Sequence, residues 1–222
     1  LCTTVASAHD FVKDGICYNI LSEEDKTVEV TYQGSYWNTV TNDYSGHVTI
    51  PETVTYGGTT YTVVAIGESA FAGCEHVTGV TIPSTIKSIG TAGFGVNEAE
   101  TDFTSVYISD LAAWCNIDFA SIASNPLSHA EYFYLNGELI TNIVIPDGIE
   151  EIKNFAFYGY GDVDITIPNS VKKIGQQAFS VYFNNVYISD LAAWCNIDFK
   201  SNPFSNADNL YLYGELVTAL VI

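Results

Sequence analysis

The fold is decided by a fifteen-residue pattern built around an Ile-Pro pair. Residues 80–94 read VTIPSTIKSIGTAGF, and residues 165–179 read ITIPNSVKKIGQQAF. In both, aliphatic residues stand three and six positions after the proline, and a phenylalanine stands eleven positions after it. The same offsets follow Pro146, while Pro51 starts a copy that Gly57-Gly58 interrupts, which favours an inserted hairpin. Phenylalanines of neighbouring copies lie 22 or 23 residues apart, a period that indicates one coil of a leucine-rich solenoid.

The apolar triplet before each proline predicts a strand. Side chains alternate along a strand, so the first and third residues are expected to point inward and the middle one outward. Proline ends the strand because it has no N–H for the ladder, and the later phenylalanine should fill the coil from the opposite wall. The middle residues should line the exposed face of one parallel sheet: Thr49, Thr81, Tyr107, Val144, Thr166, Tyr187 and Val221.

These outward residues are the candidate binding contacts. Neutral strips of threonine with spaced tyrosine can hydrogen-bond and stack against a protein or a glycan. The alternative is a solvent-facing surface without a ligand, because threonine and tyrosine have a high propensity for strands whether or not they bind anything.

A longer unit occurs twice. Residues 106–119 and 186–199 both read VYISDLAAWCNIDF, within duplicated units that span 106–145 and 186–222. After the Val-Tyr-Ile strand, an aspartate followed by apolar residues predicts a short helix, whose aspartate suits the positive end of the helix dipole. Asn136-Gly137 predicts a tight turn between strands. Because the second unit stops where the first continues into Pro146, we expect the natural array to continue or to have been trimmed.

The pattern resembles the BspA-like class of leucine-rich repeats, which is found on surface proteins of gut and oral bacteria. The resemblance rests on residues 80–94 and 165–179 and runs from about residue 48 to the end. It implies a right-handed leucine-rich-repeat solenoid, mainly β with short helices and a parallel sheet. Residues 9–47 alternate like strands and are expected to form an amino-terminal β cap over the first coil.

The chain is strongly acidic. It has 26 Asp and Glu against 7 Lys and no Arg, giving a formal charge of −19. Such a charge repels phosphate backbones and anionic lipids, so nucleic acid and membrane surfaces are poor partners, and no apolar run is long enough to span a membrane. A need for solubility explains this acidity. The alternative is that the acidic side chains bind a cationic partner or calcium.

The amino terminus has the form of a processed signal. Residues 1–8 read LCTTVASA, and Ala6-Ser7-Ala8 matches the small-x-small pattern of a signal-peptidase site. We therefore expect residues 1–8 to be a signal-peptide remnant and the protein to be extracellular or displayed at the cell surface. A lipid anchor on Cys2 is the alternative.

Motifs of catalysis are missing from the sequence. There is no nucleophile elbow, phosphate loop or metalloprotease motif, and the four histidines lie far apart. The five cysteines form no CxxC pair, so most are expected to be buried apolar residues, and Cys115 and Cys195 lie about three coils apart, too far to bond. Acidic groups at 147–151 and 162–164 are expected to be solvated rather than to bind calcium.

The expected function follows from the family resemblance, whose members are linked to host-protein binding and co-aggregation. We expect adhesion or macromolecular recognition, with a host or bacterial surface protein or glycan as partner and no cofactor. The rival is a structural spacer or stalk that presents another module and has no ligand of its own. An enzyme is the least favoured class, because no acid/base or nucleophile group was found.

Overall fold

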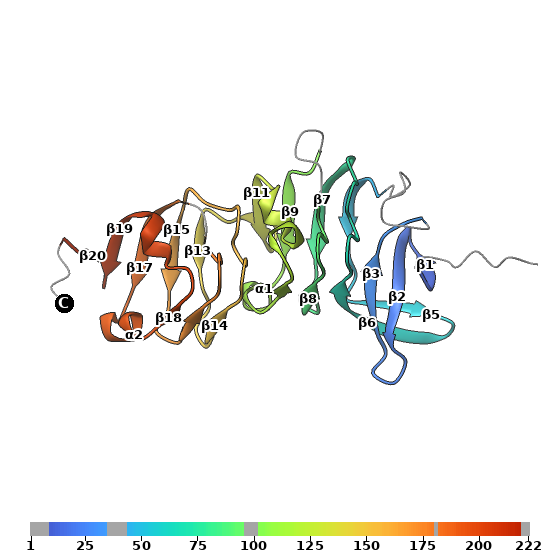
Figure 1. The fold of residues 1–222 in the computed structure, drawn as a ribbon, viewed down its shortest axis with the longest axis horizontal. Coiled ribbons are helices and arrows are strands. Elements are labelled where there is room, and N and C mark those ends of the chain that lie inside the picture. Colours follow the sequence, from blue (N-terminus) through green and yellow to red (C-terminus); the bar gives the residue numbers. More distant parts are fainter. Residues whose placement is uncertain (1–8, 35–43, 96–101, 180–181, 219–222) are drawn as a thin grey trace, which may run out of the picture.

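The chain winds into an elongated stack of coils in this computed structural model, which describes residues 9–34, 44–95, 102–179 and 182–218. Figure 1 shows the amino-terminal strands at one end and the second duplicated unit at the other. The coils are mainly strand and turn, with parallel sheets and two five-residue helices. The predicted leucine-rich solenoid is confirmed. The expected signal remnant, residues 1–8, and the outward residue Val221 lie outside the described residues.

The amino-terminal segment forms an antiparallel meander of β1 (Phe11–Lys13), β2 (Ile16–Ser22) and β3 (Thr27–Thr31). Its last strand pairs in parallel with β6 (Thr59–Ile66), so the meander shares a sheet with the first coil. The hairpin predicted at Gly57-Gly58 is present, because β5 (Thr53–Tyr56) pairs antiparallel with β6. Both glycines have positive φ, 57° and 85°, as a tight hairpin turn requires.

One wall of the solenoid carries the strands that precede the proline or its serine substitute, together with the strands of the hairpin in each duplicated unit. These strands form two five-stranded sheets, in the orders β12-β11-β9-β7-β4 and β13-β15-β17-β19-β20. The first sheet contains β4 (Gly46–Thr49), β7 (Val77–Ile82), β9 (Ser105–Ile108), β11 (Tyr132–Leu135) and β12 (Glu138–Leu139). The second contains β13 (Asn142–Val144), β15 (Val163–Ile167), β17 (Phe183–Ile188), β19 (Ala207–Leu212) and β20 (Glu215–Leu216).

The expectation that the outward residues share a single continuous sheet is therefore wrong. The turn predicted at Asn136-Gly137 forms and folds β12 back onto β11 as an antiparallel hairpin. β12 thereby occupies the edge of β11 on which the next coil would pair. As a result β13 starts a new sheet, and the expected row of outward residues is divided between two sheets.

The opposite wall is built from strands of two residues that the sequence did not predict. β8 (Ser88–Ile89) and β10 (Asp118–Phe119) extend the sheet of β6, and β14 (Glu151–Ile152), β16 (Lys173–Ile174) and β18 (Asp198–Phe199) form another parallel sheet. In β8, β14 and β16 the buried isoleucine is the residue six positions after the proline, whereas β10 and β18 carry a phenylalanine at the equivalent place. Such strands are too short to carry an alternating pattern.

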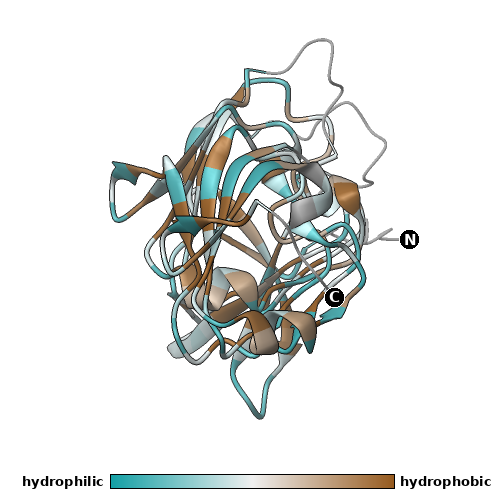
Figure 2. Cartoon of the chain, turned by 90° about the vertical axis from the view of Figure 1, so that its left-hand side faces the viewer, coloured by the Kyte–Doolittle hydropathy of each residue, from teal (hydrophilic) through white to brown (hydrophobic). Residues whose placement is uncertain are grey.

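The core runs along the axis of the stack, with the coils superimposed in the end-on view of Figure 2. The phenylalanines at offset eleven stack as predicted, Phe71 on Phe94 at 4.9 Å and Phe157 on Phe179 at 5.4 Å between ring centroids. All four are fully buried. Since burying one such side chain is worth about 1.5–3 kcal/mol, this ladder is a principal source of cohesion between coils.

Both duplicated units form the predicted helix, α1 (Leu111–Cys115) and α2 (Leu191–Cys195). At each start an aspartate, Asp110 or Asp190, accepts a hydrogen bond from a backbone N–H at 3.0 Å. The 3-10 turns η1 (Ile122–Ser124) and η2 (Pro126–Ser128) follow α1, and η3 (Pro203–Asn206) follows α2.

The two helices differ in what covers them. Trp114 Nε1 donates to the Ala156 carbonyl at 2.8 Å, and the Cys115 carbonyl accepts from the Lys153 N–H at 3.1 Å. No coil of the described chain covers α2 in this way. Cys115 is therefore buried, whereas Cys195 is exposed and is an exception to the expectation that most cysteines are buried apolar residues. Both thiols are free.

Candidate recognition surface

The same row of four residues, a threonine, two tyrosines and a leucine, lies in register on the outward face of each five-stranded sheet. In the first sheet Thr81 pairs with Tyr107, Tyr107 with Tyr134 and Tyr134 with Leu139. We call this row, Thr81–Tyr107–Tyr134–Leu139, the first strip. The second strip is Thr166–Tyr187–Tyr211–Leu216, whose members pair in the same order.

The tyrosines of each strip stack on one another. The rings of Tyr107 and Tyr134 lie 4.5 Å apart with an angle of 6° between their planes, and those of Tyr187 and Tyr211 lie 4.9 Å apart at 20°. All four are half-buried, so each pair forms a rigid aromatic ridge. Of the other residues predicted to face outward, Thr49 extends the first sheet beside Thr81, and Val144 lies beside Thr166.

The sequence analysis did not include Tyr134 and Tyr211 among the candidate contacts. Both precede the Asn-Gly or Tyr-Gly turn of a duplicated unit, and neither stands before a proline. The signal that could have found them is the turn itself: a tight turn requires a strand on its amino-terminal side, and Tyr134 then alternates outward between the apolar Phe133 and Leu135.

The polar neighbours of the two strips differ. Beside the first, His47 Nε2 lies 2.8 Å from the Thr81 hydroxyl, and the imidazole meets the Tyr107 ring edge-on at 5.0 Å. Beside the second, Asn209 donates to Asn185 at 3.0 Å and Asn185 donates to the Asp164 carboxylate at 2.8 Å. Partial desolvation, together with this carboxylate, raises the pKa of Tyr187. Its phenol therefore stays neutral and able to donate near neutral pH.

Charge is divided between the two walls. We call the outward face of the two five-stranded sheets the tyrosine wall, and the wall of β8, β10, β14, β16 and β18 the lysine wall. None of the seven lysines lies on a strand of the tyrosine wall. Two lie in the amino-terminal meander region, and the others are on or next to strands of the lysine wall: Lys87, Lys153, Lys172, Lys173 and Lys200.

Three of the acidic residues considered for calcium have other partners. Glu151 pairs with Lys173 at 2.7 Å, Glu150 pairs with Lys172, and Asp164 belongs to the amide chain described above. Within residues 9–34, 44–95, 102–179 and 182–218, no three histidine, cysteine or acidic side chains gather as metal ligands would. These exposed ion pairs are each worth under about 1 kcal/mol.

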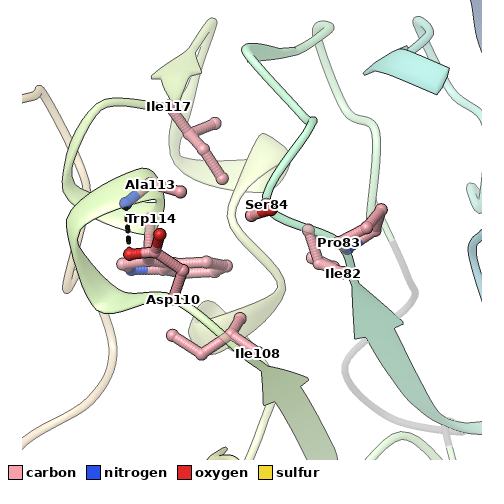
Figure 3. A pocket seen from close by; sticks show the side chains of 8 residues that line it. All are labelled: Ile82, Pro83, Ser84, Ile108, Asp110, Ala113, Trp114 and Ile117. Atoms are coloured by element: carbon pink, nitrogen blue, oxygen red, sulfur yellow. Dashed lines mark hydrogen bonds between the residues drawn. The ribbon is translucent and has the colours of Figure 1, made fainter. Parts of the chain in front are cut away.

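The enclosed spaces are too small for a ligand. Figure 3 shows a small cavity between the turn at Ile82–Ser84 and α1. Beside the Trp114 ring, the Asp110 carboxylate accepts a hydrogen bond from the Ala113 N–H. The cavity holds about 10 Å³, as does its duplicate beside Trp194, and that is room for a single water. A hollow of about 400 Å³, lined in part by Glu131, Asp162 and Tyr182, is an open depression. In the part of the chain that the structure describes, these hollows are therefore either too small or too open to enclose a ligand.

Comparison with known proteins agrees with this architecture. The model of the BspA type leucine rich repeat region matches residues 47–115 and 128–211, with six copies. The chain belongs to the BspA-type leucine-rich repeat family. None of the curated proteins compared with it matches.

Solved structures place this BspA-type chain among bacterial repeat proteins. A leucine rich cell surface protein from Faecalibacterium prausnitzii A2-165 is 17% identical, with a TM-score of 0.50 over 92% of this chain and 55% of that protein. The pneumococcal vaccine antigen PcpA is 20% identical, with a TM-score of 0.46 over 81% of this chain and 50% of that one. The chain thus spans about half the length of these two proteins. In the described part of the chain, no helix has the length and apolarity needed to cross a membrane.

Proposed function

We propose that this protein is a secreted or surface-displayed bacterial protein that recognises a macromolecule, and that its tyrosine wall is the recognition surface. The observation that carries the proposal is the pair of stacked, half-buried tyrosine ridges set in register on two parallel sheets. Aromatic side chains with a polar tip contribute strongly to interfaces because they bury much area and still satisfy a hydrogen bond.

The proposed contacts are the outward residues of both sheets. They comprise the residues expected from the sequence and the two tyrosines that the registers add: Thr49, Thr81, Tyr107, Val144, Thr166, Tyr187, Tyr134 and Tyr211. A broad face without an enclosed pocket suits a protein or glycan better than a small molecule, which needs a concave site to bury most of its surface. The family and the name of the Faecalibacterium relative support a surface location.

The test is a binding screen against host matrix proteins and glycans, run with the wild-type chain and with a Tyr107→Ala/Tyr187→Ala double variant. We expect at least one ligand whose affinity falls about tenfold or more in the double variant, because each substitution removes half of a stacked ridge. Tyr56→Ala is the control, since Tyr56 is an exposed tyrosine on β5, away from the wall. A screen without ligands would favour the spacer, and equal binding by all three proteins would refute the tyrosine wall as the recognition surface.

A further inference from the structure

We infer that the two strips are equivalent sites for lysine- or arginine-bearing segments of a protein partner, and that one molecule engages two such segments at once. This inference rests on the proposed function and adds to it the chemistry of the partner and the number of sites. Three features support it: the duplication of the strips, the charge around them, and the geometry of the rings.

The strips match in more than residue type. Each ends on a leucine held in an antiparallel hairpin, and these leucines are similarly exposed, Leu139 at 44% and Leu216 at 48%. An exposed leucine beside a half-buried tyrosine is an apolar contact that the described coils leave uncovered. Because it occurs twice at equivalent registers, a partner that fits one strip also fits the other.

The charge around both strips is negative. An exposed carboxylate stands three residues before the outer tyrosine of each strip, Glu131 or Asp208. The strands of the wall carry no lysine to neutralise them. The acidic residues of the lysine wall, by contrast, pair with lysines of the same wall. Charge complementarity therefore favours a cationic partner on the tyrosine wall.

The ring geometry favours basic side chains over sugars. A sugar stacks on an open aromatic face, but rings 4.5 Å or 4.9 Å apart cover one of each other's faces and present mainly edges and hydroxyls. The methylene stem of a lysine or arginine can instead lie along the ridge and the leucine. Its charged end then reaches a carboxylate, as amphipathic side chains do at apolar surfaces.

The spacing permits simultaneous binding. Tyr107 and Tyr187 lie on β9 and β17, and the coils between them contribute β11, β13 and β15. The three paired steps, from β9 to β11 and from β13 through β15 to β17, each measure about 4.8 Å, and the unpaired junction between β11 and β13 adds to them, so the separation is roughly 20 Å or more. A partner whose basic segments repeat at this distance gains affinity because the second contact becomes intramolecular.

The experiment uses a ten-residue peptide of alternating lysine and serine, as a monomer and as a tandem joined by a flexible fifteen-residue Gly/Ser linker, whose root-mean-square span is about 21 Å. Isothermal titration calorimetry should show two monomers bound per chain. It should show one tandem per chain, bound at least about tenfold more tightly, with an affinity that falls as salt rises.

Two sets of variants test the sites. Glu131→Gln/Asp208→Asn, which changes only exposed side chains, should weaken the monomer severalfold, whereas Glu24→Gln/Glu52→Gln removes the same charge elsewhere and should change it little. Tyr134→Ala/Leu139→Ala should leave one site per chain and abolish the gain of the tandem. Circular dichroism checks that this last variant remains folded.

The outcomes separate the inference from the proposed function. Equal weakening by both charge variants would mean non-specific attraction to an acidic protein and would overturn the inference. Two sites persisting in Tyr134→Ala/Leu139→Ala would overturn it as well. Salt-independent binding of neutral glycans that requires Tyr107 and Tyr187 would also overturn it while the proposed function stands. A screen in which no macromolecule needs the tyrosine wall would refute both.

Discussion

Asn125 joins the two halves of the solenoid, and its removal gives the sharpest test of how they are held together. The residue is fully buried between η1 and η2, in the region where neither wall has a strand pair across the junction. Its Nδ2 donates to the carbonyls of Phe155 at 2.6 Å and Ala156 at 3.1 Å, and its Oδ1 accepts from the Leu127 N–H at 2.9 Å. Together with the bond from Trp114 Nε1 to the Ala156 carbonyl and the bond from the Lys153 N–H to the Cys115 carbonyl, this side chain takes the place of the missing ladder.

Asn125→Ala should lower the free energy of unfolding by about 3 kcal/mol, because three buried hydrogen bonds are lost at about 1 kcal/mol each. The control is Asn202→Ala, the duplicate position in the same Ser-Asn-Pro context. Asn202 is half-buried and lies beyond α2, so we expect a loss of about 1 kcal/mol or less, of the size of a local cap.

The assay is urea unfolding followed by far-ultraviolet circular dichroism and tryptophan fluorescence. With an m-value of about 3 kcal/mol/M, a 3 kcal/mol loss moves the midpoint by about 1 M. Because coils are coupled only to their neighbours, weakening the junction should also separate the two probes' transitions. A midpoint shift for Asn125→Ala no larger than that for Asn202→Ala would refute the idea that these bonds carry the junction.

Three further predictions use other features of the same structure. Trp114→Phe, which removes the indole donor to the Ala156 carbonyl, should cost about 1 kcal/mol more than Trp194→Phe in thermal melts; equal costs would contradict the role of that bond. Maleimide labelling at neutral pH, mapped by mass spectrometry, should modify Cys195 and spare Cys115, whose pKa burial raises to about 12; labelling of Cys115 in the folded chain would contradict the packing of α1. Burial raises the pKa of Tyr18 from 10.0 to about 12, so the stability it contributes is complete below pH 10.0 and is lost as pH rises toward 12. Tyr18→Phe should make this alkaline fall in melting temperature shallower, and an unchanged fall would assign it to other groups.

The sequence by itself determined the features that depend on residues close together in the chain. The Ile-Pro triplets become strands that end one or two residues before the proline, the phenylalanines at offset eleven form the buried ladder, and Asp110 caps its helix. The turn at Asn136-Gly137 forms as well. Each of these follows from side-chain alternation, a missing N–H, a cap or a positive φ, and all of these act over a few residues.

Only the tertiary structure decided how the coils meet. The sequence predicts the Asn136-Gly137 turn. It does not predict that β12, which follows this turn, occupies the free edge of β11 and divides the tyrosine wall into two sheets. Nor could two-residue strands such as β14 reveal the opposite wall, which also gathers five of the lysines. The identical stretches at 106–119 and 186–199 make the physical reason plain. Their local folds are the same, yet one cysteine is buried and the other exposed, because burial is set by the coil packed against a helix and not by the sequence of the helix itself.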